Sequence, residues 1–412
     1  MAEEKTLSNI ENKSEKEESV KKPEPSPLSS REQRIKLIRK IQEIRGSKVI
    51  SYICGDRRGA PNAQIAEDAI RPMYDHVKSC GDVKKIDIFL YSKGGAIEVP
   101  WRMITMLREY CKHLSVLIPY HAQSAATLLA LGCDEIVMGR KAELGPIDPA
   151  LSFAHGEGTE AKEQIGVEDV MSFIRFTKNV AGLTDQAALT KNVDILTKKL
   201  PPWHLGKIYR THSHIRMIAQ RMLSCHAKKL DDQLINRVTN TLAEEIYSHG
   251  HAICRNEAND IGLPVDKSTP EFDALLWELL ESYEDLMELR QPIDPQVLFP
   301  QGQDEVSLDV IIAVIESEII TSAFNGALKF KRFRETPANV NINLNVGVQL
   351  PPQITPESTP AAIQQSINQL INELKSQAPK WVMEQTKQQS PVSKIEGRFE
   401  NAAWRDISQK GV

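Results

Sequence analysis

Short apolar runs rich in β-branched residues alternate with segments of helical periodicity between residues 48 and 138. The runs have the length of buried strands, and the segments between them repeat apolar residues every three or four positions. The predicted strands are 48–54, 85–91, 114–119 and 135–138, and the predicted helices are 64–79, 97–110 and 124–131. Strands that alternate with helices predict βαβ units with right-handed crossovers and a largely parallel sheet.

Helical periodicity also marks the segments on either side of this region. Residues 31–45 predict an amphipathic helix with a basic opposite face, because one stripe carries Ile35, Ile38, Ile41 and Ile44. We expect this stripe to pack on its own domain, and a partner or a membrane surface is the alternative. Residues 165–262 are mainly helical with a break at Pro201-Pro202, and residues 270–290 predict another amphipathic helix.

The C-terminal third of the chain has a less regular pattern. The apolar segment 307–334 fits either a strand or a helix, whereas residues 340–350 alternate strictly between apolar and polar residues and predict a strand. The polar face of that strand suits a sheet edge or pairing with another subunit. Residues 358–376 are expected to be helical, and the Gln- and Lys-rich end of the chain is expected to be a mobile tail.

Composition excludes several classes of protein. The chain has 412 residues, of which 41% are hydrophobic and 26% are charged, and these values are ordinary for a soluble globular protein. The net charge of -4 gives no general electrostatic reason to bind nucleic acid, and no segment resembles a nucleic-acid-binding module. Scattered cysteines, the lack of a signal-peptide core and the absence of a run of about 18 apolar residues predict a cytoplasmic protein without a transmembrane segment.

Two segments at predicted strand ends carry residues suited to chemistry. Gly94 and Gly95 follow the strand 85–91. Their amides can face the cleft at the carboxyl ends of the strands and donate to an oxyanion. A Gly-Gly pair also suits a plain tight turn. Ser124 stands where a strand turns into a helix of small residues, so it fits either a helix cap or a nucleophile. The amide of Ala125 would then be the second oxyanion donor.

These segments and the loop that follows them resemble a known superfamily. A Gly-Gly loop, a serine at a strand-to-helix turn about 30 residues later, and a further loop resemble the Clp protease/crotonase superfamily. The run SAATLLALGCDEIVMGRKAELGPIDP closely resembles the serine dehydrogenase proteinase family, relatives of signal peptide peptidase A. The resemblance covers roughly residues 35–265. It implies a Clp/crotonase-like α/β fold of repeated ββα/βαβ units, followed here by a mainly helical C-terminal extension.

The resemblance implies a role for each matching residue. Ser124 matches the nucleophile, Gly95 and Ala125 match the two oxyanion amides, and Gly94 supports the turn. The general base is less clear, because Asp148 stands where Clp proteases have a histidine. A carboxylate is a poor base for a serine hydroxyl unless its pKa is raised or a second group relays the proton.

Other residues downstream of Ser124 are alternatives for the base. Enzymes like signal peptide peptidase A use a buried lysine beyond this loop, and Lys178 lies at a comparable distance and is narrowly preferred. Lys162 is a second lysine, and His155 is close enough in sequence to Asp148 to swing into the site. Asp148 would then orient a partner or hold the loop.

The resemblance implies a serine endopeptidase that cleaves polypeptides through an acyl-enzyme and assembles as a homo-oligomer. Residues 270–290 and 340–350 are our candidates for oligomer contacts. The same amides would suit a crotonase-like enzyme that stabilises the enolate of an acyl thioester, but the chain shows no evident CoA-binding signature. A catalytically inactive peptide-binding scaffold is the other alternative, because no histidine occupies the usual position of the base.

No cofactor or metal is expected. Histidines and cysteines gather between residues 204 and 254, but their spacing fits no standard zinc site, and no GxxxxGKS/T run indicates an ATPase. The predicted organisation is a disordered tail at 1–30, a Clp/crotonase-like peptidase domain at 31–265, an extension at 266–376 for oligomer or protein-partner contacts, and a flexible tail at 377–412.

Overall fold

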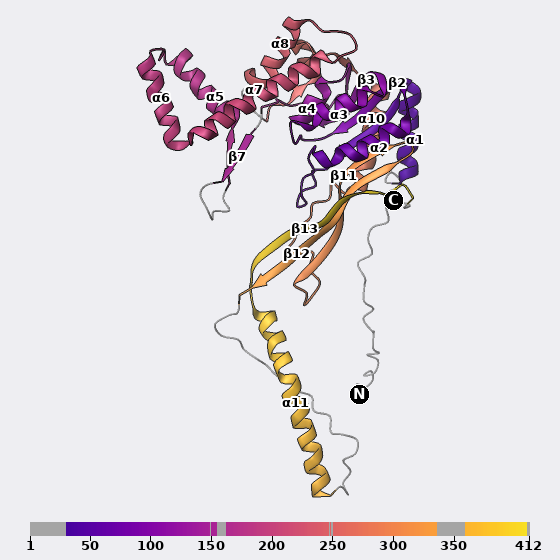
Figure 1. The fold of residues 1–412 in the computed structure, drawn as a ribbon. Helices are drawn as coiled ribbons and strands as arrows, with labels where there is room; N and C mark the ends of the chain where they lie inside the picture. Colours follow the sequence, from indigo (N-terminus) through magenta and orange to yellow (C-terminus); the bar gives the residue numbers. More distant parts are fainter. Residues whose placement is uncertain are drawn as a thin grey trace, which may run out of the picture.

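The computed structural model describes residues 30–148, 150–154, 162–246, 248, 250–335 and 359–409. Its largest sheet has the strand order β10-β5-β3-β2-β1-β11-β12-β13, and Figure 1 shows the helices that cover it. The strands that are parallel to one another are β1 (Lys48–Cys54), β2 (Val83–Tyr91), β3 (Cys111–Ile118), β5 (Glu135–Met138) and β10 (Val265–Lys267). The predicted α/β class and its parallel sheet are therefore confirmed.

These strands are apolar on both faces because helices cover both faces. α2 (Ile70–Cys80), α3 (Val99–Arg108) and α4 (Ala125–Leu131) pack on the face that carries Tyr52 and Ile88. α1 (Arg31–Arg45) and α10 (Pro270–Leu286) pack on the opposite face. The stripe of α1 thus packs on its own domain as expected, with Ile35, Ile38 and Ile41 buried and Ile44 exposed.

α10 is a core helix. Its apolar side is buried against α1 and the sheet, so the segment 270–290 does not present that side for oligomer contacts. The predicted oligomer strand at 340–350 lies outside the described residues.

The chain between the parallel strands β5 and β10 is mainly helical, as predicted. A hairpin of β7 (Ala150–Ala154) and β8 (Lys162–Gly166) leads into α5 (Val167–Arg175), the π-helical turn η3 (Phe176–Val180) and α6 (Gln186–Lys199). The predicted break is confirmed, because α7 (Pro202–Ser224) begins at Pro202. In Figure 1, α5 and α6 project away from the sheet, and α7 returns to contact α3 and α4. Within the described ranges, no helix is both long and apolar enough to cross a membrane.

Shorter elements complete this region. β4 (His121–Ala122), β6 (Glu143–Leu144) and β9 (Ile253–Cys254) form a small separate sheet beside the start of α4. The remaining helices are η2 (Glu67–Ala69), α8 (Asp232–Asn240), the π-helical turn η4 (Thr241–Glu245) and α9 (Arg255–Ile261).

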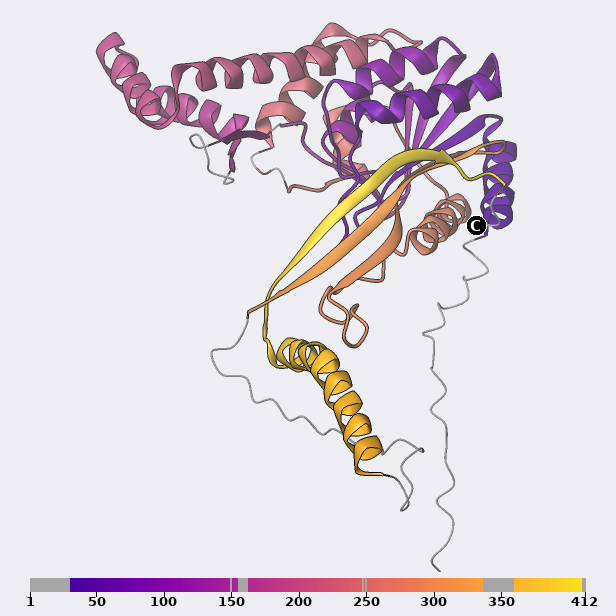
Figure 2. The same ribbon diagram turned by 60° about the horizontal axis from the view of Figure 1, so that its bottom comes forward.

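The C-terminal part differs from its prediction. The ambiguous segment 307–334 forms two strands, β11 (Glu305–Ser317) and β12 (Thr321–Arg334), and β11 pairs with β1, so the sheet continues across the predicted boundary at residue 265. The predicted flexible tail at 377–412 instead contains the end of α11 (Pro360–Gln389) and the whole of β13 (Val392–Asp406), which pairs with β12. Figure 2 shows β12 and β13 as a long ribbon with α11 at its far end.

A buried ion pair joins the first helix to this C-terminal sheet. The guanidinium of Arg34 on α1 holds the carboxylate of Glu316 on β11 with Nε–Oε2 and Nη2–Oε1 distances of 2.7 and 3.2 Å, and both side chains are 0% exposed. The same carboxylate accepts hydrogen bonds from the hydroxyls of Tyr283 on α10 and Thr321 on β12, at 2.8 and 2.7 Å. Arg34 is therefore a buried exception among the basic residues of α1, because Glu316 is buried opposite it.

Removing one member of this pair is expected to destabilise the fold strongly. Glu316→Leu leaves a buried guanidinium without its carboxylate and should lower the free energy of unfolding by about 3–5 kcal/mol. Arg34→Met combined with Glu316→Leu should be less destabilised than Glu316→Leu alone, because no charge is left unpaired. Urea unfolding measures both.

The matched control for that comparison is Arg39→Met, which breaks the exposed pair between Arg39 and Glu318 and should change stability by less than about 1 kcal/mol. Strictly additive effects of the two core substitutions would contradict the coupling of Arg34 with Glu316.

His76 predicts that the stability of the contact between α2 and the strands β11 and β12 depends on pH. It is buried on α2, with Nδ1 3.0 Å from Ser317 Oγ and Nε2 3.1 Å from Ser322 Oγ. Burial lowers the pKa of His76 to about 4, whereas an unfolded histidine has a pKa of about 6.5. The unfolded state therefore binds the extra proton between these values, and stability present above pH 6.5 should fall as the pH drops towards 4.

The slope approaches about 1.4 kcal/mol per pH unit between the two pKa values, so the urea unfolding free energy should be lower at pH 5 than at pH 7 by about 2 kcal/mol. His76→Gln should reduce this difference, whereas His251→Gln, on an exposed residue, should leave it in place. An unchanged pH dependence in His76→Gln would assign the effect to other groups.

Candidate active site

Ser124 lies at the turn between β4 and α4, where the backbone is strained. Its φ of 53° and ψ of -117° fall in a region that non-glycine residues rarely occupy. Its side chain accepts no capping hydrogen bond from α4, so the hydroxyl is not used as a helix cap. Ser124 itself is half-buried, and the helix that follows it is buried along its whole length. The strained turn thus presents a hydroxyl that the helix does not need.

The glycine loop after β2 lies directly against this serine. Gln123 N donates to Ser92 O at 3.0 Å and Ser92 N donates to His121 O at 2.9 Å, which binds the two segments edge to edge. Gly94 has a φ of 112°, and a Cβ at that position would lie 2.8 Å from Ser124 Cβ and 3.2 Å from Ser124 Oγ. Only glycine allows this approach.

A second backbone bridge sets the direction of the Gly95 amide. Ile65 N donates to Gly94 O, and Ala96 N donates to Ile65 O, both at 2.8 Å. In this parallel pairing the N–H of Gly95 itself is directed away from Ile65. Within the described chain, neither Gly95 N nor Ala125 N donates a hydrogen bond to the protein. The loop and the start of α4 therefore leave two backbone donors available in the segments that flank Ser124.

Thr127 fixes the loop that follows β6 against α4. Its buried hydroxyl lies 2.8 Å from Ala122 O and 2.9 Å from Gly145 O, and it accepts a hydrogen bond from Gly145 N at 3.1 Å. A Cβ on Gly145 would lie 3.1 Å from the Cβ of Gln123. The chain therefore passes Ser124 closely before it reaches Asp148, which is half-buried.

The candidates for the general base fall in different places. Lys178 is exposed on η3, between α5 and α6, and among the described residues no hydrogen bond or ion pair joins it to Ser124. The burial that its predicted role requires is therefore not found. Lys162 pairs with Ala154 in the β7–β8 hairpin, which follows Asp148 directly. His155 lies outside the described residues.

Sequence reasoning missed a histidine–carboxylate pair next to the serine. His121 Nδ1 lies 2.7 Å from Glu143 Oε1, and the His121 ring stacks on Tyr120 with 3.5 Å between centroids. Gln123 also donates to Glu143 at 3.1 Å. Burial lowers the pKa of His121, while the charge of Glu143 opposes that shift. The parallel register of β4 and β6 creates the pair, and no spacing in the sequence indicates that register.

In the described residues no hydrogen bond joins His121 to Ser124, and its contact with Glu143 links the short strands β4 and β6. A second polar group lies near it at the strand ends, where Asp56 accepts from the hydroxyl of Tyr91 at 2.9 Å and pairs with Lys93 at 2.6 Å. Both carboxylates are thus already engaged with neighbouring side chains.

A comparison with protein families finds a match over this region. Residues 22–172, which include Gly94, Gly95 and Ser124, match the model of the ClpP-like SDH-type serine proteinases. This segment is therefore similar to the SDH-type serine proteinases. The resemblance predicted from the sequence is confirmed, and the match agrees with the predicted Clp/crotonase-like fold.

Two uncharacterized proteins of Methanocaldococcus jannaschii are similar to this chain. One is 24% identical over 256 residues, which are 60% of this chain and 78% of that protein. The other is 22% identical over 260 residues, which are 61% of this chain and 76% of that protein.

Three solved structures are similar to part of this chain, with low TM-scores. The 1510-N membrane-bound stomatin-specific protease, in one mutant form, gives a TM-score of 0.32 at 14% identity and covers 56% of this chain and 85% of its own. A second mutant of that protease, in complex with a substrate peptide, gives 0.21 at 19% identity and covers 54% and 93%. A probable enoyl-CoA hydratase/isomerase from Mycobacterium abscessus gives 0.25 at 16% identity and covers 55% and 67%.

The closeness of Gly94 to Ser124 predicts the effect of adding one methyl group. Gly94→Ala must relieve a 2.8 Å contact with Ser124 Cβ at a φ that alanine disfavours, so the serine should be displaced. Displacement of a reacting group by about 1 Å costs roughly 100-fold in rate, and we expect a loss of this order in the reaction of Ser124 with a fluorophosphonate.

Gly206→Ala on α7 is the matched control, because a Cβ there meets nothing within 4 Å. Wild-type reactivity in Gly94→Ala would show that the close approach is not needed.

Proposed function

We propose that this chain is an active serine endopeptidase whose nucleophile is Ser124. One observation carries the proposal: a half-buried serine at a strained φ of 53°, whose side chain caps no helix, lies beside backbone amides that have no acceptor in the described chain. Strain of this kind costs about 1–3 kcal/mol and persists where the surrounding structure enforces it. The fully buried helix α4 supplies that enforcement.

The reaction follows from these groups. Ser124 Oγ attacks the carbonyl carbon of a peptide bond, its proton passes to a base, and the carbonyl electrons move to the oxygen. The amides of Gly95 and Ala125 donate to that oxyanion, and one such donor contributes about 100- to 1000-fold in rate. The intermediate collapses to an acyl-enzyme and releases the amine, which takes the proton, and water then frees the acid in the same two steps.

We further propose that the base comes from the segment that begins at Asp148. A lysine must be desolvated to act as a base near neutral pH, and the exposure of Lys178 counts against it. Thr127 holds the preceding loop against α4, so Asp148, His155 and Lys162 follow directly from a point close to Ser124. The polypeptide substrate, the cytoplasmic location and the homo-oligomer expected from the sequence stay predictions.

One observation favours the inactive scaffold as the second candidate. No basic side chain in the described residues forms a hydrogen bond with Ser124 Oγ. Serine peptidases commonly bring the base within about 3 Å of the nucleophile, although the bond is often looser without substrate.

Labelling with a fluorophosphonate probe tests the proposal. The probe should modify Ser124, located by mass spectrometry of the digested adduct, and Ser124→Ala should abolish the adduct. Ser224→Ala, which removes an exposed hydroxyl on α7, should label like the wild type. Asp148→Asn, His155→Ala, Lys162→Ala and Lys178→Ala identify the base, and we expect Lys178→Ala to label normally.

The absence of labelling in a folded protein would favour the scaffold. Abolished labelling in Lys178→Ala alone would restore that lysine as the base. Hydrolysis or isomerisation of an acyl thioester without peptide cleavage would favour the crotonase-like alternative.

A further inference from the structure

The largest sheet ends in a long strand with one unpaired edge. β13 has 15 residues and pairs on one side with β12, and in the described part of the chain no strand pairs with its other side. A long exposed edge presents a row of backbone donors and acceptors that favours pairing with another strand. The question is which strand fits.

The middle of β13 is regular and bounded on both sides. Its pairing with β12 runs without a shift from Lys394, opposite Phe333, to Glu400, opposite Ala327. Register shifts lie just beyond each end of this run, and Asn401 has a φ of 55°. The regular run 394–400 is therefore a short straight edge with Gly397 at its centre.

Symmetry restricts how such an edge can pair with its own copy. Along a strand, the N–H and C=O groups of successive residues point alternately to its two edges. Two residues can therefore face one another in an antiparallel pair only if both direct these groups towards the partner strand or both direct them away from it. A two-fold axis relating two copies must therefore pass through a residue that faces itself. With Gly397 on the axis, Glu396 faces the partner's Arg398, and Lys394 faces the partner's Glu400.

This register matches opposite charges at every position. Each of the two contacts occurs twice across the axis, and directly opposed side chains on one face interact by about 0.2–1 kcal/mol per pair. Placing Glu396 on the axis would oppose Lys394 to the partner's Arg398. Placing Arg398 there would oppose Glu396 to the partner's Glu400. An axis through Ile395 would oppose Lys394 to the partner's Glu396, and an axis through Phe399 would oppose Arg398 to the partner's Glu400, so each of these axes makes one opposite-charge contact in place of two.

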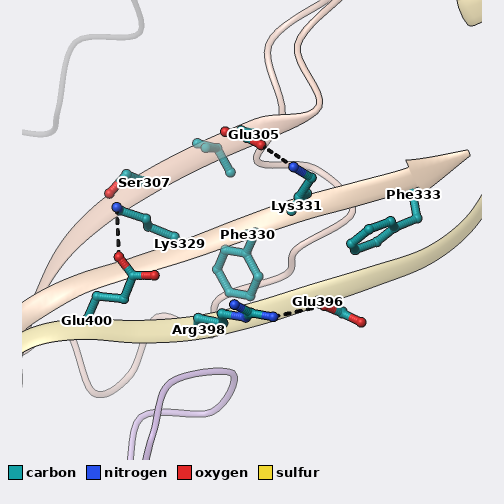
Figure 3. A pocket seen from close by; sticks show the side chains of 10 residues that line it. Glu305, Ser307, Lys329, Phe330, Lys331, Phe333, Glu396, Arg398 and Glu400 are labelled. Atoms are coloured by element: carbon teal, nitrogen blue, oxygen red, sulfur yellow. Dashed lines mark hydrogen bonds and ion pairs between the residues drawn. The ribbon is translucent and has the colours of Figure 1, made fainter.

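The side chains are placed to make these contacts. Figure 3 shows Glu396, Arg398 and Glu400 along β13, beside an open groove of about 580 Å³ between β11, β12 and β13. Lys394 and Arg398 are 65% and 76% exposed, so their charged groups are accessible to a partner, and Glu400 lies 2.8 Å from Lys329 of its own chain. Glu396 lies 2.7 Å from Lys394 and 3.9 Å from Arg398, and so the dimer would extend an ionic row that already exists.

The other face of β13 is apolar, and a two-fold axis through Gly397 also brings its apolar residues together. Ile395 and Phe399 pack against the cluster around Leu328 and Phe330, and the same register places Ile395 opposite the partner's Phe399. Gly397 has no side chain to separate the two strands, and the Phe330 ring fills that space, because a Cβ there would lie 2.9 Å from Phe330 Cε1. Charge lies on one face and apolar contact on the other.

We propose that two copies of this chain pair edge to edge through β13, antiparallel and centred on Gly397, and form one sheet across both subunits. The occupant of the edge is thus a second copy of the chain. This interface lies on the C-terminal ribbon and is independent of the proposed chemistry of Ser124. It also differs from the oligomer contacts predicted from the sequence.

Charge reversal in the full-length chain tests this register. Arg398→Glu places four carboxylates around the axis, and Glu396→Arg places four guanidinium groups there. Each variant should raise the dimer dissociation constant by about 10- to 100-fold, measured by sedimentation equilibrium. A mixture of the two variants should recover the dimer, because each position then faces the opposite charge, and the double variant Glu396→Arg/Arg398→Glu should dimerise like the wild type.

Glu305→Lys is the matched control, since it reverses a charge of the same groove on β11, two strands from the edge, and should leave the dimer intact. Carbodiimide cross-linking of isotope-mixed wild-type chains should join Lys394 to the partner's Glu400. Circular dichroism and urea unfolding check that each variant is folded.

A wild-type chain that stays monomeric up to its solubility limit would overturn the proposal. So would dimers that survive both single reversals, or a mixture that fails to recover them. Capture of a foreign polypeptide on the edge in place of a second copy would also overturn it.

Discussion

The buried ion pair between Arg34 and Glu316 is the constraint on which the arrangement of the whole molecule depends. Removing a guanidinium and a carboxylate from water is costly unless each finds its partner in good geometry. That requirement fixes α1 against β11, and the hydroxyls of Tyr283 and Thr321 extend it to α10 and β12. The first helix and the last strands of the chain are therefore parts of one core. The extension after residue 265 completes the sheet whose strands β2 and β3 lead into the loops around Ser124.

The same sheet determines the position of the candidate site. Parallel strands end at one edge, so the loops after β2 and β3 lie side by side, and the bridges of Ser92 and Ile65 hold them there. The strain at Ser124 is local, whereas its support comes from α4, Thr127 and the loop at Gly145. Backbone hydrogen bonds on both sides hold the segments that carry the hydroxyl and the amides. The proposed electrostatic catalysis would need preorganisation of this kind.

The parallel part of the fold and the strand-to-helix turn at Ser124 could be predicted from the sequence. The predicted strands 48–54 and 135–138 have the bounds of β1 and β5, because both faces of those strands are buried and their residues form continuous apolar runs. Ser124 and the two glycines stand out because turn chemistry and small residues depend on local sequence. These features are local, and local pattern is what a single sequence records.

The rest depends on contacts between distant segments. The burial of Arg34 requires a carboxylate 282 residues away, and the pairing of His121 with Glu143 requires the register of two short strands. The segment 307–334 mixes buried and exposed positions in strands near the edge of the sheet, so neither helical nor strand periodicity dominates it. Residues 392–406 are polar because they form an edge strand, and a polar composition at the end of a chain instead predicts a mobile tail. The base could not be chosen because it depends on where the hairpin after Asp148 lies.

The backbone conformation of Ser124 also bears on how this position can vary. A φ of 53° is energetically unfavourable for serine but not for glycine. Ser124→Gly would therefore relieve backbone strain while it removes the hydroxyl. Stability and chemistry therefore pull the residue in opposite directions, as they do where function maintains a locally unfavourable structure. A lineage that lost the need for the hydroxyl would drift towards glycine here. The identity of this one residue among homologues thus records whether selection still acts on the reaction.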